Sequence, residues 1–326
     1  MSRHSDIPRS DMGRSDIPRI ATIGMFDGVH RGHRLLVDEL CRRGAAFGYT
    51  PIVFTFADHP LREIAPAKCP PLLTDINTKR AQLQTLLPAS GAVEVLEFDE
   101  AMRTMTAAAF IAMLRDRYRV RAIVRGHDHT FGHDRPDADT LAKIARAAHV
   151  DIYTAPVLHD DITGAAICSS VIRQAIVEQG DMAAAERMLG RPYDIHGIVV
   201  KGSQIGRTIG FPTANILPDR RIAIPRNGVY AATIDVAPLS SGCIAPLSSS
   251  GAMVNIGTAP TVSQGEAPRV RIEAHIFDFE GDIYGAQVIL QPRAYLRAEQ
   301  RFAGIDALAA RLRDDARAAR AILNSR

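Results

Sequence analysis

Two histidines three residues apart, His30 and His33, follow the apolar run Ile20–Phe26 and precede a segment with helical periodicity. Side chains three positions apart at the start of a helix lie on the same side of its first turn. The free backbone N–H groups of such a turn attract anions, and Gly28 and Gly32 allow a phosphate to approach the backbone closely. Two imidazoles beside these amides can offset the charge that develops on an α-phosphate. The segment therefore predicts a nucleotidyl-transfer site, although either histidine alone would be typical of a structural residue.

Two later segments carry groups that suit the same reaction. Gly126-His-Asp-His-Thr-Phe-Gly132 follows the strand-like run Ala122–Arg125, and open α/β sheets bind ligands beyond the carboxyl ends of their strands. Ser169 and Ser170 lie at a predicted helix start, and Arg173 follows one turn later. Hydroxyls, free N–H groups and a guanidinium together predict a triphosphate site, whereas Ser169 by itself would also suit a helix cap.

A second candidate site lies in the glycine-rich segment 201–215. Gly202 and Gly206 make this loop pliable and accessible to phosphate. The pattern G-x-x-x-x-G-K-[S/T] occurs nowhere in the sequence, which excludes a Walker-type loop. Thr213 and Asn215 offer two neutral oxygens, a donor set suited to a magnesium ion that keeps its waters and bridges nucleotide phosphates.

The elements that must position these residues differ between the two parts of the chain. In the first part, β-rich runs alternate with helical stretches, which predicts a parallel sheet with helices on both faces. The expected strands are Ile20–Phe26, Ile52–Phe56, Val93–Phe98, Ala122–Arg125 and Ile152–Val157, and the expected helices are Gly32–Leu40, Thr78–Leu87, Ala107–Tyr118 and Thr140–His149.

After about Asp181 the strand-like runs follow one another without helices, which predicts a small antiparallel barrel or sandwich. The repeated word Ala-Pro-Leu-Ser-Ser, at 237–241 and 245–249, predicts an inserted loop. A terminal helix is expected over Arg301–Leu323, with Phe302, Ile305, Leu308 and Leu312 on one face. The expected strands are Tyr193–Lys201, Gly228–Val236, Ala252–Ile256, Val270–Phe279 and Gln287–Arg297.

The length of 326 residues is typical of two domains. Residues 1–18 repeat a polar, proline-containing word and are expected to form a disordered tail. We expect the first domain to span residues 19–181 and the second to span residues 184–323.

Composition excludes several classes of protein. The net charge of +3 does not indicate a nucleic-acid partner, and no apolar run reaches the ~18–20 residues of a membrane span. The polar start after Met1 has no secretory signal, and the four cysteines are far apart. Free thiols and a cytoplasmic location are therefore expected.

Two sequence motifs resemble those of a known family. Gly24-x-Phe-Asp-Gly-x-His-x-Gly-His33 and Gly206-Arg-Thr-Ile-Gly-Phe-Pro-Thr-Ala-Asn215 resemble the two signatures of the bifunctional bacterial riboflavin kinase/FMN adenylyltransferases, or FAD synthetases. The resemblance extends over residues 19–320 and includes Pro225–Tyr230, Val254–Thr261 and Glu273–Phe279. It implies an α/β plus β architecture: a Rossmann-like H-x-G-H nucleotidyltransferase module, followed by an antiparallel riboflavin-kinase β-barrel with a terminal helix.

The resemblance also implies roles for residues of the first module. His30 and His33 would stabilise the transferring adenylyl phosphate. The other residues would bind or shape the pocket for nucleotide and flavin: the loop residues Gly24, Phe26, Asp27 and Gly28, the pocket residues Gly126 and Asp128, and the phosphate-binding residues Ser169, Ser170 and Arg173.

In the second module, the resemblance implies that Glu273 is the general base that takes the proton of the ribityl 5′-hydroxyl. Its surroundings alone would indicate a solvated strand residue. Thr213 and Asn215 would hold magnesium. Gly202, Gly206, Arg207 and Arg297 would contact nucleotide or flavin, with Arg297 near the flavin.

The implied chemistry has two steps, both with magnesium. ATP phosphorylates riboflavin to FMN, and a second ATP adenylylates FMN to FAD with release of pyrophosphate. The expected partners are the small molecules riboflavin, FMN and ATP, without nucleic acid or membrane, and a weak homo-oligomer is left open.

Three alternatives remain at this point. One is a riboflavin kinase with a degenerate adenylyltransferase half, because Asp58 stands where the family has proline and Val171 where it has a hydroxyl residue. Another is a flavin-binding sensor without turnover, against which the presence of Glu273, Thr213 and Asn215 argues. The third, an H-x-G-H transferase that acts on pantetheine or nicotinamide nucleotides, leaves the second module unexplained.

Overall fold

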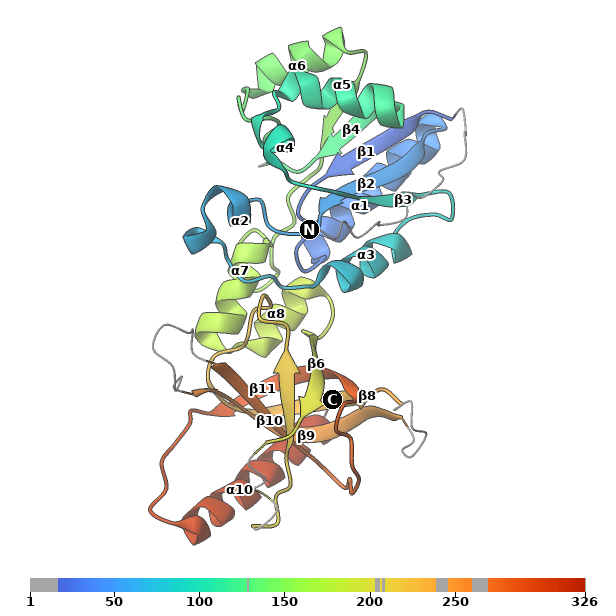
Figure 1. Ribbon diagram of the computed structural model, residues 1–326. Helices are drawn as coiled ribbons and strands as arrows, with labels where there is room; N and C mark the ends of the chain where they lie inside the picture. Colours follow the sequence, from blue (N-terminus) through green and yellow to red (C-terminus); the bar gives the residue numbers. More distant parts are fainter. Residues whose placement is uncertain are drawn as a thin grey trace. The chain divides into compact units, whose positions relative to one another are not determined.

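The computed structural model describes residues 17–127, 129–202, 206, 209–238, 246–259 and 269–325. The chain forms two compact units, drawn in Figure 1. The first unit holds the chain up to Met25 together with Leu35–Ala57 and Leu83–Pro156, and the second holds Phe26–Arg34, Asp58–Gln82 and the chain from Val157 on. The expected tail lies outside the described residues except at positions 17 and 18.

A five-stranded parallel sheet forms the centre of the first unit, in the order β3-β2-β1-β4-β5 (Figure 1). Every neighbouring pair is parallel, which confirms the predicted α/β sheet. The strands are β1 (Arg19–Ile23), β2 (Thr50–Phe56), β3 (Ala92–Leu96), β4 (Val120–Arg125) and β5 (Asp151–Thr154).

The helices between these strands begin where side chains cap their free N–H groups. Thr106 accepts from the N–H of Ala109 at the start of α5, and Asp137 accepts from the N–H of Thr140 at the start of α6. Leu114 of α5 is fully buried in the apolar cluster that covers the sheet. The elements in this part of the chain are α1 (Arg31–Phe47), α2 (Leu61–Ile64), η1 (Pro66–Lys68), α3 (Ile76–Thr85), α4 (Glu100–Thr104), α5 (Ala107–Tyr118) and α6 (Ala138–Ala147).

The strand order creates a topological switch point at the carboxyl ends of β1 and β4. The chain runs from β1 outward to β2 and β3, and then returns to the other side of β1 as β4. Loops that leave neighbouring strands in opposite directions open a crevice, where ligands bind in sheets of this type. Gly24 directly follows β1 and Gly126 directly follows β4, so both predicted residues lie at this switch point.

Three helical segments open the long C-terminal part of the second unit. α7 (Ser169–Gln174) begins at the predicted serine and passes into a π-helical turn, η2 (Ala175–Gln179). Asp181 then caps α8 (Met182–Leu189) by accepting from the N–H of Ala184. The domain boundaries expected around this point stay a prediction.

A closed six-stranded barrel follows, in the order β10-β7-β6-β11-β8-β9, and all of its pairs are antiparallel. This confirms the predicted barrel. β7 was not among the expected strands, because Pro212 before it and Pro218 at its end are unfavourable in a sheet. The strands are β6 (Ile195–Val200), β7 (Ala214–Pro218), β8 (Gly228–Val236), β9 (Leu247–Ala259), β10 (Arg269–Ile276) and β11 (Gln287–Arg297).

β9 corrects one expectation about the repeated word Ala-Pro-Leu-Ser-Ser. The second copy was expected in a loop, but its last three residues, Leu247–Ser249, open this long strand. They pair with β8, since Leu247 lies opposite Val236. Residues 239–245, which include most of the first copy, lie outside the described part of the chain.

The terminal helix, α10 (Ile305–Asn324), also differs from the expectation. It begins after Gly304, so Phe302 precedes it, and Ile305 is 64% exposed. The side that packs on the barrel carries Leu312, Ala316, Ala319 and Leu323. The expected face is confirmed at Leu312 but was wrong at two positions, because the later start removes Phe302 from the helix and places Ile305 at its exposed end.

Two further properties concern the whole described chain. None of the helices in the described ranges is both long and apolar enough to span a bilayer. Cys41, Cys69 and Cys168 are free thiols, as expected, while Cys243 lies outside the described residues.

Gly132 provides a test of the first unit. It has φ +68°, and a Cβ there would overlap the backbone nitrogen of Ala107 and the Asp134 carboxylate, which accepts the Ala107 N–H at 2.8 Å. Gly132→Ala should therefore cost roughly 1–2 kcal/mol for the positive φ and roughly 1–3 kcal/mol more for the displaced helix start. Gly164→Ala is the matched control, because Gly164 has the same φ but nothing within 4 Å of the added Cβ. Thermal unfolding should show the larger loss for Gly132→Ala, and equal losses would contradict this account.

Candidate active sites

The loop between β1 and α1 has a strained backbone. Phe26 and Val29 have φ values of +50° and +41°, and Gly28 between them has +83°. Positive φ is unusual for any residue with a Cβ and more so for a β-branched one. Such strain persists only where the surrounding contacts enforce it, and it concentrates at functional sites.

Hydrogen bonds to the buried carboxylate of Asp27 do much to hold this loop in its strained conformation. Its Oδ1 accepts the backbone N–H groups of Leu73 and Thr74 at 2.8 and 3.2 Å, and its Oδ2 accepts Arg173 Nη2 at 2.9 Å. Arg173 Nε also donates to the carbonyl of Pro71 at 2.7 Å. Burial raises the pKa of Asp27, although the Arg173 guanidinium and the Leu73 N–H both oppose that rise.

The two serines predicted to bind phosphate differ in their contacts. The Ser169 hydroxyl donates to the backbone carbonyl of Asp27 at 2.9 Å. Ser170 is exposed, and its hydroxyl lies 3.1 Å from the Cys168 thiol. The structure therefore brings Asp27, Ser169 and Arg173 together, and it leaves Ser170 facing solvent beside them.

The imidazoles of His30 and His33 stack with their ring centroids 3.6 Å apart and an interplanar angle of 18°. The His33 backbone N–H donates to His30 Nδ1 at 3.3 Å, and the Phe26 ring meets His33 edge-on at 5.1 Å. Burial holds the pKa of His33 well below its usual value, and the charges of His30 and Lys79 add to this effect. A neutral His33 results at pH 7. Its Nδ1 is buried without a hydrogen-bond partner among the described residues.

Lys79 is a residue that sequence reasoning missed. It is one of four lysines in the chain and is only 1% exposed in α3. Burial lowers the pKa of Lys79 to about 8, against the attraction of Asp27, Asp58 and Asp75. The scarcity of lysine in the chain was the only feature of the sequence that set Lys79 apart, and it did not indicate where Lys79 lies in the fold.

The remaining predicted residues of this site belong to the first unit or lie outside the described residues. Gly24 and Gly126 belong to the first unit, where the Gly24 N–H donates to the Phe54 carbonyl at 3.1 Å. Asp128 lies outside the described residues. Their roles stay predictions.

In the barrel, one row of the ladder aligns residues from five consecutive strands. Arg297 lies opposite Val229, Val229 opposite Asn255, Asn255 opposite Glu273, and Glu273 opposite Asn215. Directly opposite residues project to the same face of a sheet. The register thus brings the predicted site residues Asn215, Glu273 and Arg297 into one row. It also adds Asn255, which sequence reasoning missed.

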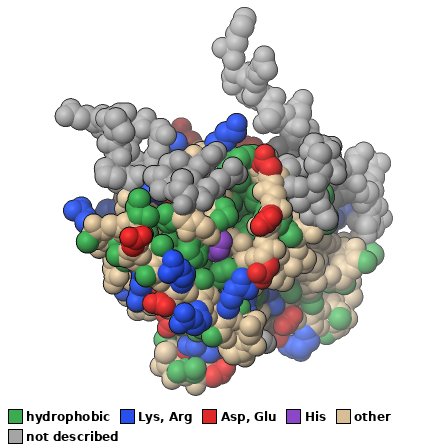
Figure 2. All heavy atoms as spheres, turned by 90° about the horizontal axis from the view of Figure 1, so that it is seen from below, with side chains coloured by type: hydrophobic (Ala, Val, Ile, Leu, Met, Phe, Trp, Pro, Cys, Tyr) green, Lys and Arg blue, Asp and Glu red, His purple; other side chains and the backbone are tan. Residues whose placement is uncertain are grey.

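A cavity of about 360 Å³ opens on this row. Val229, Asn255, Glu273 and Arg297 of the row line it together with Thr213. Apolar side chains, among them Phe211, Met253, Leu308 and Leu312, also line it. Figure 2, a view onto the barrel end of the chain, shows hydrophobic side chains in a hollow bordered by charged ones.

A second cavity of about 340 Å³ shares one wall with the first. Thr213 lines both cavities, while Pro212, Phe279 and Tyr284 line only the second. Two adjacent cavities separated by a hydroxyl residue can hold two reactants with their reacting groups close together.

The glycine-rich loop fits closely around the predicted metal ligands. A Cβ on Gly202 would overlap the Asn215 amide, and one on Gly206 would overlap the carbonyl of Phe211. The Phe211 N–H donates to the Gly206 carbonyl at 2.9 Å. Both glycines therefore permit close approach, whereas Arg207 lies outside the described residues.

Arg297 lines the first cavity, but its guanidinium is bound to another residue. Nε contacts Asp315 Oδ1 at 3.0 Å, Nη2 contacts Asp315 Oδ2 at 2.6 Å, and the carboxylate is 3% exposed. This bidentate pair attaches α10 to β11. A contact of Arg297 with flavin stays a prediction.

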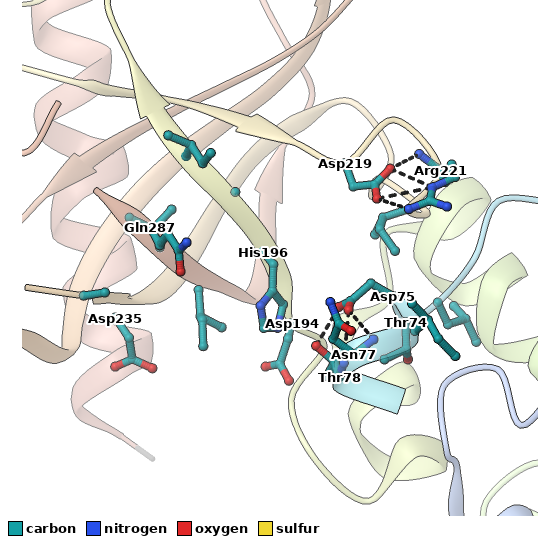
Figure 3. A pocket seen from close by; sticks show the side chains of 18 of the residues that line it. Thr74, Asp75, Asn77, Thr78, Asp194, His196, Asp219, Arg221, Asp235 and Gln287 are labelled. Atoms are coloured by element: carbon teal, nitrogen blue, oxygen red, sulfur yellow. Dashed lines mark hydrogen bonds and ion pairs between the residues drawn. The ribbon is translucent and has the colours of Figure 1, made fainter. Parts of the chain in front are cut away.

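A third cavity, of about 580 Å³, is lined by none of the predicted site residues (Figure 3). Its charged groups are already paired or capped. Arg221 and Asp219 meet at 2.8 Å, and Asp75 accepts the N–H groups of Asn77 and Thr78 at 2.9 and 3.0 Å. We therefore assign it no part in the chemistry.

The Asp27 contacts generate a prediction about stability. Asp27→Asn keeps the acceptor for Leu73 and Thr74 but removes the charge that faces Arg173. Because Arg173 is partly exposed and keeps its bond to Pro71, the loss should be roughly 2–3 kcal/mol, less than for a fully buried pair. Asp161→Asn is the control, since its contact with Arg31 at 3.3 Å is largely exposed and should be worth less than about 1 kcal/mol. Thermal unfolding measures both, and similar values would contradict the assigned role of Asp27.

Comparison with known proteins identifies two family models that match this chain. The model for FAD synthetase matches residues 14–171, and the model for riboflavin kinase matches residues 189–323.

Similar proteins cover nearly the whole length. The bifunctional riboflavin kinase/FMN adenylyltransferase of Escherichia coli K12 is 37% identical over 303 residues, which is 92% of this chain and 91% of that protein. The protein with the same description from Bacillus subtilis 168 is 30% identical over 312 residues, 91% of this chain and 90% of that one. Among solved structures, a macrolide-efflux protein from Streptococcus pneumoniae has a TM-score of 0.81 at 28% identity, covering 95% of this chain and 96% of that chain. The chain belongs to the family of bifunctional riboflavin kinase/FMN adenylyltransferases.

Proposed function

We propose that this chain performs the two activities of its family at two separate sites: riboflavin kinase in the barrel and FMN adenylyltransferase at the loop of His30 and His33. Both activities use ATP and a flavin. The observation that carries the assignment is the barrel row that places Glu273 between Asn215 and Asn255, in a cavity whose wall, at Thr213, belongs also to a second cavity.

Riboflavin binds in the first of these cavities, where apolar side chains such as Met253 and Leu308 pack on its ring system. ATP binds in the second, where Tyr284 and Phe279 offer aromatic surface to the adenine. Glu273 takes the proton of the ribityl 5′-hydroxyl as that oxygen forms a bond to the γ-phosphorus of ATP. The bond from that phosphorus to the bridging oxygen breaks, so FMN and ADP are formed.

The barrel also fits a divalent ion. In the described ranges no group of three or more His, Cys, Asp or Glu side chains could hold a metal by itself. The hydroxyl of Thr213 and the amide of Asn215, held against Gly202, supply neutral oxygens and leave positions for water and phosphate. Magnesium takes oxygen ligands and keeps several waters beside substrate phosphates, so this pair could hold it, and when bound it would neutralise charge on the transferring phosphate.

At the second site, an oxygen of the FMN phosphate attacks the α-phosphorus of ATP and pyrophosphate leaves. His30 and His33 lie beside the reacting phosphate, where their imidazole N–H groups donate hydrogen bonds to the phosphate oxygens. Asp27 positions Arg173, whose remaining N–H groups bind the ATP phosphates with Ser169 and Ser170.

The remaining expectations complete the proposal. Gly24, Phe26, Gly28, Gly126 and Asp128 shape the adenylyl site, and Gly206, Arg207 and Arg297 shape the kinase site. The two functional domains span residues 19–181 and 184–323. The protein acts in the cytoplasm on small molecules, without nucleic acid or membrane, as a monomer or weak homo-oligomer.

The decisive test follows both products from riboflavin, ATP and magnesium by chromatography. His30→Ala should form FMN at the wild-type rate and accumulate it, because only adenylyl transfer needs the imidazole. Glu273→Gln keeps the size of the side chain but removes the base, so FMN formation should fall at least about 100-fold. The same variant should convert added FMN to FAD normally.

Each other outcome has a definite meaning. Wild-type protein that stops at FMN would identify a kinase with a degenerate second half. Absence of any FMN would support a flavin-binding sensor. Loss of both reactions in either variant would contradict the assignment to two separate sites.

A second test concerns magnesium. Asn215→Ala removes one of the two neutral oxygens, so the magnesium concentration for half-maximal kinase activity should rise roughly fivefold to tenfold, the equivalent of about 1 kcal/mol. The magnesium dependence of adenylyl transfer should not change. Asn77→Ala is the control, because Asn77 lies in α3 and not in a strand of the barrel. An unchanged magnesium requirement in Asn215→Ala would remove Asn215 from the metal site.

A further inference from the structure

His275 lies where the ladder between β10 and β7 stops. The register pairs Glu273 with Asn215 and Ala274 with Ala214, so the next position on β10 is His275, opposite Thr213. β7 begins at Ala214, and Pro212 just before Thr213 has no N–H with which to continue the ladder. The backbone of residues 211–213, the stretch before β7, therefore needs a different attachment to β10.

The imidazole of His275 provides that attachment. Its Nδ1 lies 2.8 Å from the carbonyl oxygen of Pro212. A carbonyl oxygen can only accept, so Nδ1 carries the proton in this contact. The rings of Phe211 and Phe277 meet the imidazole edge-on at 5.1 and 5.8 Å and hold its plane.

The attached stretch contains residues that line the kinase cavities. Phe211 lines the first cavity, Pro212 the second, and Thr213 both. At its other end, the stretch is closed by the bond from the Phe211 N–H to the Gly206 carbonyl at 2.9 Å. The His275 contact is thus the side-chain bond that fixes this wall to the strand that carries Glu273.

We propose that His275 is a positioning residue of the kinase reaction: through the Pro212 carbonyl it holds Thr213 at a fixed distance from Glu273, so that the phosphate and the flavin hydroxyl meet in register. It acts on the wall between the two cavities and takes no proton from the substrate. This inference rests on the proposed kinase site. Small displacements of a positioned group reduce turnover more than substrate binding.

Three substitutions separate the hydrogen bond from the packing. His275→Asn places an amide N–H near the position of Nδ1, His275→Gln places its amide near the other ring nitrogen, and His275→Phe keeps an aromatic ring without a donor. The kinase kcat should stay within about threefold of wild type for the Asn variant and fall roughly tenfold for the Gln and Phe variants. The KM for riboflavin should change less than about twofold, while the magnesium requirement should rise in the Gln and Phe variants only.

Two internal controls accompany the measurement. Conversion of FMN to FAD should be unchanged in all three variants, and Glu273→Gln tests the kinase site itself. If Glu273→Gln keeps full kinase activity, the proposed site is wrong. If Glu273→Gln is inactive but His275→Phe has wild-type kcat and magnesium dependence, only the role of His275 is wrong.

Further results would also overturn the positioning role. One is an Asn variant that is as impaired as the Gln variant, and another is a parallel loss of FMN-to-FAD conversion. Thermal unfolding is measured for each variant. If the Gln and Phe variants do not fold, the Asn variant decides: it must restore both folding and turnover, and its failure rejects the proposal.

Discussion

The kinase half of this protein depends on the register of one closed barrel. Five strands from different parts of the chain align Arg297, Val229, Asn255, Glu273 and Asn215 in a single row. Side chains in neighbouring strands share a face only at matched register, and a slip of one residue would reverse every side chain on the slipped strand. The closed ladder therefore positions the proposed base Glu273, its neutral neighbours and the floor of the proposed flavin cavity together. Where the ladder ends at Pro212, a side chain continues the attachment.

The adenylyltransferase half depends on the buried carboxylate of Asp27, where the kinase half depends on the hydrogen-bonded ladder of its strands. Asp27 holds together three segments of the second unit: the histidine loop, residues 71–74 and the start of α7. A buried carboxylate is tolerated only when it is paired and hydrogen-bonded, and Asp27 meets both conditions. The strained φ values at Phe26 and Val29 are held by these contacts.

The two proposed sites bind phosphate without a Walker lysine. The chain has four lysines, and Lys79, the one beside Asp27, is buried. Imidazoles, a guanidinium, hydroxyls and amides take its place. Hydrogen bonds orient these groups, as with Arg173 on the Pro71 carbonyl, and His275 on the Pro212 carbonyl holds the stretch that carries the Thr213 hydroxyl. Because such bonds have defined directions, the orientation of each group follows from the local backbone.

The sequence by itself determined the parallel sheet, the antiparallel barrel, the family and the residue types at both sites, because periodicity and the two signature words are local properties of the chain. It did not show β7, whose prolines obscured it, the true start of α10, or the partners of Asp27. Lys79 carried no distinctive local pattern, and the family-like segments that contain Asn255 and His275 did not single out either residue. Only the tertiary structure decided these, because strand register, burial and the choice of hydrogen-bond partner depend on residues far apart in the chain, whose proximity no local spacing encodes.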